Sequence, residues 1–443
     1  MLSPLCAHLL VRSNRLRILS RLTLVLSLLV VDTATAAPPL TLGQAQQQAV
    51  ARSRQLNAQE YAIAGARDMA IAAGQLPDPV LKAGIDNLPV STRERFSLTK
   101  DFMTMRRIGI SQELTRADKR KSRSARYESE ARKSEAQKDV ILAGIQRDTA
   151  IAWLERYYIE QMAALISVQA NQARQEIEAA TAAYRAGRGT QADILAARSA
   201  LLLLGDQASE IERRLQVAQT MLTRWTGVDD DFVLAGRPDI DHIRLDAATL
   251  DTALAHHPRI TVFNRQEQVA RAQASLARTN QRADWSVEVA FQQRGSAYSN
   301  MVSVGLSVPL QLDRKNRQDR ELGATLAMVE QTMAERDEAL REHVAEARAL
   351  IAQWKSGRER IARYTSALIP LSGESAQALL AGYRGGKATL AEVLSARRNE
   401  TEVRMQAVEL QLDTSRLWAQ LNFLFPDGAS VQQAITSDLQ DTK

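Results

Sequence analysis

The sequence predicts a mainly α-helical protein with a small transmembrane β part, and this fold class rests on three observations. Long stretches of the chain contain no proline, four short segments alternate apolar with polar residues, and the same order of segments occurs twice. The internally duplicated protomer is therefore expected to combine long helices with four strands. We expect a trimer to close a barrel of about twelve strands, which a ring of long helices extends as an α-barrel.

The N-terminus is predicted to be a secretory signal peptide at residues 1–36. An apolar core at Leu22–Val31 precedes a small-residue cleavage site at Ala34–Ala36. This leader holds four arginines and one aspartate, so its removal lowers the formal net charge from +6 to +3. So small a charge does not indicate a nucleic-acid-binding protein. The basic residues before the apolar core are Arg12, Arg15, Arg17 and Arg21.

Cysteine usage and hydropathy limit what the mature chain can be. The single cysteine, Cys6, lies in the leader, so we expect no disulfide, no thiolate metal site and no lipid on an N-terminal cysteine. No apolar run of about 18 residues follows the leader, which argues against a spanning helix. A mature chain that crosses a bilayer must then do so with closed β-strands.

Two structural repeats are predicted, at residues 37–240 and 241–425, with a C-terminal tail at 426–443. The first repeat is expected to contain strands near 80–88 and 106–114, a long helix at 118–186, a tip turn at 184–193 and a helix at 190–226. The second is expected to contain strands near 284–293 and 300–309, a long helix at 314–383, a tip turn at 383–392 and a helix at 389–424. At 1.5 Å per residue each long helix extends about 100 Å, and the second is expected to bend at Pro370.

Each predicted strand has one apolar and one polar face. Four such strands cannot close a barrel, and open edges in lipid leave backbone groups unpaired, so a single protomer must associate with others. In that arrangement the apolar face meets outer-membrane lipid and the polar face lines water. The aromatic residues Trp285, Phe291 and Tyr298 fit a membrane-interface girdle better than a soluble core.

A twelve-residue segment that begins at Tyr184 returns 199 residues later, beginning at Tyr383. Both copies follow the pattern Tyr-x-x-Gly-x-x-Thr-x-x-(Asp/Glu)-(Ile/Val)-Leu, and each stands where one long helix ends and another begins. The glycines permit the tight backbone of a turn, and the threonines are expected to be N-caps. The residues concerned are Gly187, Thr190 and Asp193 in the first copy and Gly386, Thr389 and Glu392 in the second.

This duplicated pattern, together with the two strand pairs and the helix lengths, resembles TolC-type outer-membrane efflux factors over about residues 40–425. Within that family, the segments at 76–79, 86–90 and 101–107 resemble outer-membrane components of heavy-metal resistance systems. The resemblance implies a homotrimer in the outer membrane of a Gram-negative bacterium, with its helices in the periplasm. A periplasmic adaptor and a proton-driven inner-membrane pump are the implied partners, and substrate flows passively to the outside.

The resemblance also assigns roles at the tips. Asp193 and Glu392 match the acidic positions of a cation-selective pore constriction, although a second acid found in relatives is replaced here by Ser395. Tyr383 matches a gate tyrosine, and Tyr184 is its counterpart in the first copy. From the residues alone, both acids are equally well explained as early-turn acids that favour a helix start, and the tyrosines as packing residues at coil ends.

Nothing in the sequence indicates catalysis, a cofactor or a bound metal. Met103 and Met105 are read as part of a connection between strands, and His256–His257 as a helix start, while His343 is isolated on a helix. An export duct for heavy-metal cations is thus the leading hypothesis, with a multidrug or type I secretion duct as the alternative in the same architecture. A periplasmic coiled-coil or adaptor protein is the alternative from another class.

Overall fold

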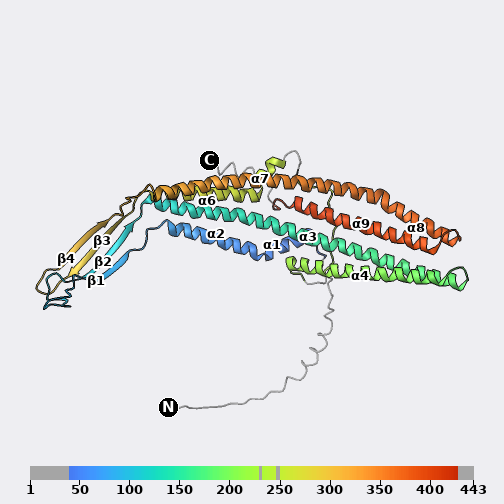
Figure 1. The fold of residues 1–443 in the computed structure, drawn as a ribbon, viewed down its shortest axis with the longest axis horizontal. Helices are drawn as coiled ribbons and strands as arrows, with labels where there is room; N and C mark the ends of the chain where they lie inside the picture. Colours follow the sequence, from blue (N-terminus) through green and yellow to red (C-terminus); the bar gives the residue numbers. More distant parts are fainter. Residues whose placement is uncertain (1–38, 229–231, 246–249, 428–443) are drawn as a thin grey trace, which may run out of the picture.

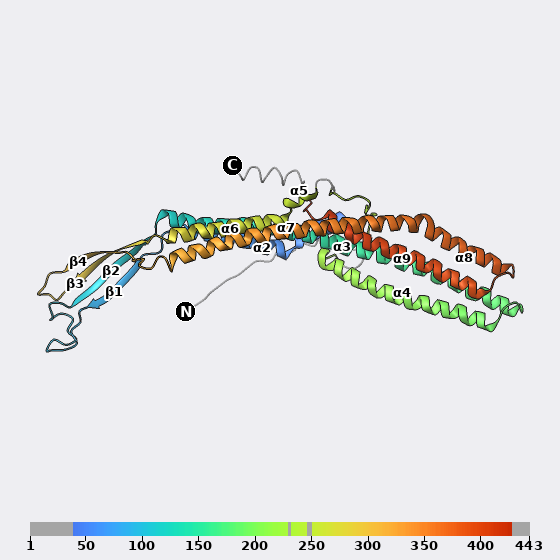
Figure 2. The ribbon, with the colours of Figure 1, turned by 45° about the horizontal axis from the view of Figure 1, so that its top comes forward.

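The computed structural model describes residues 39–228, 232–245 and 250–427. The predicted signal peptide at 1–36 and residues 428–443 of the predicted tail lie outside the described residues. The chain forms a long, gently curved rod with a β-sheet at one end and two helical hairpins at the other (Figures 1 and 2). Helices of both repeats run side by side between these ends, so sheet and hairpin tips are separated by almost the whole length of the molecule.

The sheet has four antiparallel strands in the order β1-β2-β3-β4. These are β1 (Val80–Asp86), β2 (Met105–Leu114), β3 (Trp285–Gln293) and β4 (Met301–Ser307). The two halves of the chain meet where β2 pairs with β3, and β1 and β4 are the sheet edges. All four strands lie where the alternating pattern predicts them.

The register aligns the apolar residues of neighbouring strands into rows on one face. Leu81 pairs with Ile110, which pairs with Val289, which pairs with Val304. All four side chains are exposed in the single chain, as are Ile108, Phe291, Val302 and Leu306 on the same face. Cross-strand rows of β-branched and aromatic residues stabilise a sheet, yet an uncovered apolar surface of this kind requires a non-aqueous environment or a partner.

The long helix α3 (Ala117–Arg185) holds the two ends of the rod together. It packs against α2 (Arg54–Ala73) and α6 (Pro258–Asn280) near the sheet, and against α4 (Gln191–Thr226) and α9 (Leu390–Asn422) toward the tips. The short helices α1 (Leu42–Arg52) and α5 (Leu250–Ala255) lie near the middle (Figures 1 and 2). Buried residues lie on several faces of α3, for example Ala152, Trp153 and Leu154 in succession, so one helix can pack against several neighbours.

The main core lies at mid-length, where the connection between the repeats crosses the helices. Three buried tryptophans donate indole N–H groups to its backbone and to the segment before α1. Trp153 donates to the Leu40 carbonyl at 3.0 Å, Trp354 to that of Ile240 at 3.0 Å and Trp418 to that of His242 at 2.8 Å. Around them pack Leu154, Met162, Leu222, Leu254, Leu412 and Leu421. This core fixes the two repeats relative to each other.

The second long helix is interrupted, unlike α3. Helix α7 (Gln318–Arg363) passes through a π-helical turn at Tyr364–Leu368 into α8 (Ile369–Arg384). The irregular turn stands just before Pro370, at which a bend is predicted. Proline has no N–H to offer to the carbonyl four residues earlier and its ring crowds that carbonyl, so the preceding turn widens. In the described residues no helix combines the length and the apolar character needed to cross a membrane.

Candidate functional site at the helix tips

Each hairpin ends in the same turn, far from the sheet. After α3, the Gly187 N–H donates to the Tyr184 carbonyl at 3.0 Å, and the Arg188 N–H donates to the Ala183 carbonyl at 2.9 Å. After α8, Gly386 and Lys387 repeat both bonds, to Tyr383 and Gly382, at 3.0 and 2.8 Å. Gly187 and Gly386 adopt φ values of 71° and 74°, the left-handed conformation that glycine tolerates best. Both helices therefore end in Schellman motifs.

The helices that follow each turn begin with a capping box. The Thr190 hydroxyl accepts from the Asp193 N–H at 3.2 Å, while one Asp193 carboxylate oxygen accepts from the Thr190 N–H at 2.8 Å. Thr389 and Glu392 form the same reciprocal pair, at 3.3 and 2.7 Å. The predicted N-caps are confirmed, and both acids contribute to helix starts. The carboxylates remain at the surface, because Asp193 is half-buried and Glu392 is exposed.

The charged state of Glu392 is favoured by its cap. Hydrogen bonds from the Thr389 backbone N–H and from the Thr389 hydroxyl hold the pKa of the Glu392 carboxyl below its ordinary value. A carboxylate that accepts hydrogen bonds is stabilised in its ionised form. Glu392 is therefore negatively charged at neutral pH.

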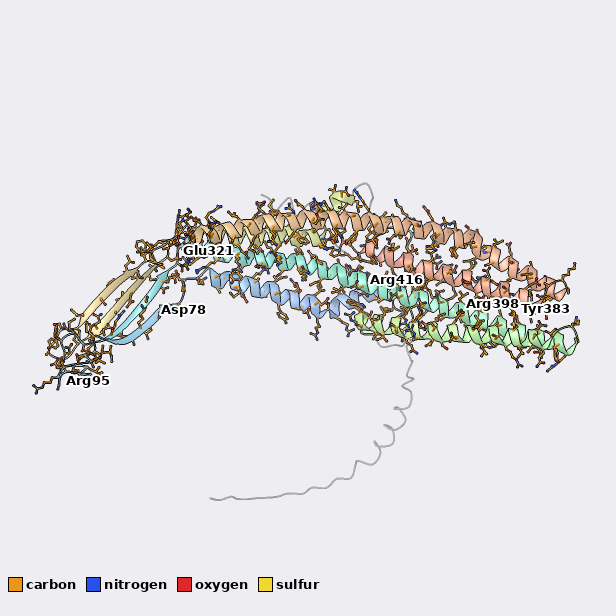
Figure 3. All side chains as sticks on the ribbon, viewed as in Figure 1. Asp78, Arg95, Glu321, Tyr383, Arg398 and Arg416 are labelled. Atoms are coloured by element: carbon orange, nitrogen blue, oxygen red, sulfur yellow. The ribbon has the colours of Figure 1, made fainter. Side chains whose placement is uncertain are left out.

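The two tip tyrosines have different environments. Tyr383 packs against a small apolar cluster in which α3, α4, α8 and α9 meet, and its hydroxyl is buried without a hydrogen-bond partner among the described residues. Tyr184 lies outside that cluster and its side chain is 48% exposed. Figure 3 shows Tyr383 at the end of the rod opposite Arg95, which lies beyond the sheet. The cluster is formed by Ala180, Ala197, Leu390, Val393 and Leu394, with Ile177, Ile194, Ala200, Leu379 and Leu380 around it.

Next to this apolar cluster, a group of charged side chains connects the two hairpins. Arg397 of α9 lies 3.4 Å from the Glu176 carboxylate of α3 and 2.8 Å from that of Glu400. Arg404 contacts the other Glu400 oxygen at 3.0 Å. Burial raises the pKa of the Glu176 carboxyl, and the nearby Arg397 opposes this shift. Glu400 is buried, so two arginines compensate a charge that would otherwise be costly there.

Two of these charged side chains line a cavity between the hairpins. A cavity of about 660 Å³ lies between α3, α4 and α9, lined by Glu176 and Arg397 and by residues such as Gln172, Leu203, Arg214 and Met405. No sequence motif predicted this region. The spacing of Arg397, Glu400 and Arg404 along one helix face offered a signal, but the contact with Glu176 in the other repeat did not.

The comparisons with known proteins agree with this architecture. Residues 249–425, the second repeat, match the family model described as "Outer membrane efflux protein". This stretch is therefore similar to that family. Across most of its length it is 23% identical to the cobalt-zinc-cadmium resistance protein CzcC of Cupriavidus metallidurans, over 389 residues that cover 86% of this chain and 88% of the relative.

Most of the chain also has the fold of solved channels. The outer-membrane channel OprN superposes with a TM-score of 0.74 at 15% identity, covering 88% of this chain and 90% of OprN. CusC superposes with a TM-score of 0.74 at 14% identity, covering 87% and 92%. The TolC-type resemblance and the predicted fold class are thereby confirmed.

Proposed function

We propose that this protein forms a passive duct across the outer membrane, and that three copies of the chain together complete the wall of the duct. The observation that carries the proposal is the sheet, which has an uncovered apolar face and two unpaired edges, β1 and β4. Unpaired strand edges and apolar faces are both removed when β4 of one copy pairs with β1 of the next in lipid. Three copies give a barrel of about twelve strands, and their helices continue it as a tube.

The periplasmic end of the tube is the proposed gate. Each protomer contributes Asp193 and Glu392 at the two turns, so three copies would place six carboxylates around the axis. Rings of carboxylates attract cations and exclude anions where a pore is narrow. Tyr383, whose buried hydroxyl has no partner among the described residues, is proposed to hold adjacent coils together, with Tyr184 as its exposed counterpart.

Heavy-metal cations are the proposed substrate, delivered by a periplasmic adaptor and a proton-driven inner-membrane pump. The support is the relative CzcC, whose name states cobalt, zinc and cadmium resistance. Acidic tips suit such cargo because they carry the opposite charge. A duct for drugs or for secreted polypeptides has the same architecture, so the substrate is decided by experiment.

Two measurements test the proposal. The mature protein, purified in detergent, is expected to have the mass of a trimer, and a monomer would remove the argument from barrel closure. A strain that lacks the gene is expected to become sensitive to zinc, cobalt or cadmium and to regain resistance with the wild-type gene. Sensitivity to dyes and antibiotics without any change toward metals would assign the duct to drug export instead.

A further inference from the structure

The polar face of the sheet carries a charged network that no tip residue explains. Glu288 of β3 receives two cations, one on each carboxylate oxygen: Lys82 of β1 at 2.7 Å and Arg107 of β2. The Arg107 guanidinium also lies 3.7 Å from the Asp86 carboxylate of β1. The Arg107 guanidinium thus contacts the carboxylates of both Asp86 and Glu288, and Lys82 contacts that of Glu288 as well.

Small residues make this network possible. Lys82 lies opposite Gly109, which in turn lies opposite Ala290. The lysine side chain therefore crosses β2 at a residue that has no side chain of its own. A Cβ added to Gly109 would lie 2.7 Å from the Ala290 Cβ, closer than side chains tolerate. Gly305 faces Glu288 on β4 and leaves its other side open. The strands are therefore shaped so that long charged side chains lie flat across the sheet.

Stability is only part of what this network can provide. The side chains of Lys82, Arg107 and Glu288 are 47%, 30% and 22% exposed, so solvent reaches each of them and weakens the ion pairs. An exported cation, in contrast, would meet these groups directly, since the proposed function places this face toward the water-filled lumen. Conduction requires that a binding site in the path be weak enough for the ion to leave.

We infer that Arg107 and Lys82 are resident counter-ions that prevent the Asp86–Glu288 carboxylate pair from retaining exported divalent cations. The inference rests on the proposed function and extends it to a second position in the duct. Carboxylate oxygens are ligands that bind divalent cations, and the Arg107 guanidinium contacts both carboxylates. With both cations present, each Glu288 oxygen already has a partner.

Zinc titration of the detergent-purified trimer tests this without requiring current. The double variant K82Q/R107Q is expected to bind Zn²⁺ at least about tenfold more tightly than wild type does. The triple variant K82Q/R107Q/E288Q is expected to lose that gain in affinity. The matched control R67Q/K138Q removes two cations from the ion pairs that Glu135 and Glu60 make between α2 and α3. It is expected to leave Zn²⁺ affinity unchanged.

Equal Zn²⁺ affinity in wild type and K82Q/R107Q would overturn the inference, as would an equal gain in the control. If the double variant does not assemble, the single variant R107Q decides in the same way, with a smaller gain because Lys82 remains on Glu288. In planar bilayers, Zn²⁺ is expected to block current through K82Q/R107Q at concentrations that leave wild type open. If no variant conducts, the proposed duct fails, while the titration still decides whether Arg107 masks the carboxylates.

Discussion

Thr190 and Thr389 determine how the acids of the tips are held. Each hydroxyl caps a helix, and each backbone N–H binds the carboxylate that we propose to face the pore. Capping and pore lining are compatible roles, because a carboxylate accepts the cap bonds through one oxygen and retains the other for solvent or cations. Removing charge and removing the cap are therefore separable experiments.

Substitution of the second cap tests the local part of this account. Thr389→Ala is expected to destabilise the start of α9 by about 1 kcal/mol, since the first-turn N–H groups lose their acceptor. Faster hydrogen exchange at the first-turn amides, up to Glu392, would report the loss. Thr389→Ser keeps a hydroxyl and is expected to behave like wild type. Equal exchange in all three proteins would show that the cap contributes nothing.

His257 and His343 are a residue pair whose protonation opposes the fold. Their rings lie 4.2 Å apart at the centroids, and both side chains are buried. Burial, reinforced by the neighbouring His343, lowers the pKa of His257 from 6.5 to about 3. Burial likewise lowers the pKa of His343, with Arg259 acting in the same direction and Glu346, 3.5 Å away, opposing it.

Acid is therefore expected to destabilise the protein through this pair. Both histidines are neutral in the folded protein, whereas in the unfolded chain they take up protons near their ordinary pKa of 6.5. Their contribution to the free energy of unfolding is therefore fully present above that pH. It is lost as the pH falls from about 6.5 toward the lowered pKa values. His343→Leu removes one titrating group, and its unfolding midpoint in detergent should fall less between about pH 7 and pH 5 than that of wild type. An unchanged pH slope would contradict this.

The sheet and the interrupted helix show which features of an element the sequence reveals. Alternation located all four strands because the two faces of each strand meet different environments. Pro370 indicated an irregular helix, but the position of the π-helical turn depends on how the backbone before the proline relaxes. The contact of His343 with His257 was likewise missed: a lone histidine on a helix says nothing about the neighbour that packs on it.

Gly109 provides a test of the sheet as an element. Gly109→Ala is expected to destabilise the protein by about 1–3 kcal/mol, because the added Cβ would overlap Ala290 in the neighbouring strand. Gly305→Ala is the matched control, since the nearest atom to its added Cβ is 3.9 Å away. Urea unfolding in detergent compares the two variants. Equal midpoints for both would show that the close pairing of β2 and β3 is not required.

At the scale of the whole molecule, the duplication and the segment pattern predicted the arrangement of helices and strands. The proposed barrel closure rests on sheet edges that lipid cannot leave unpaired, and the length of the rod follows from helices with little proline. The tip motif located Asp193 and Glu392 but not their surroundings. The link from Arg397 to Glu176 and the network around Glu288 join residues more than 180 positions apart, which no local pattern encodes.

The most direct test of the duct is planar-bilayer conductance of the purified mature protein beside the double variant D193A/E392A, with D193N/E392Q as the control that keeps the cap bonds and removes the charge. The account predicts small, cation-selective currents from wild type. Both variants should carry larger currents with reduced cation selectivity, because the tip carboxylates have lost their charge. Unchanged selectivity would contradict the acidic constriction. Absence of conductance from all three proteins, together with solubility without detergent, would contradict the duct itself.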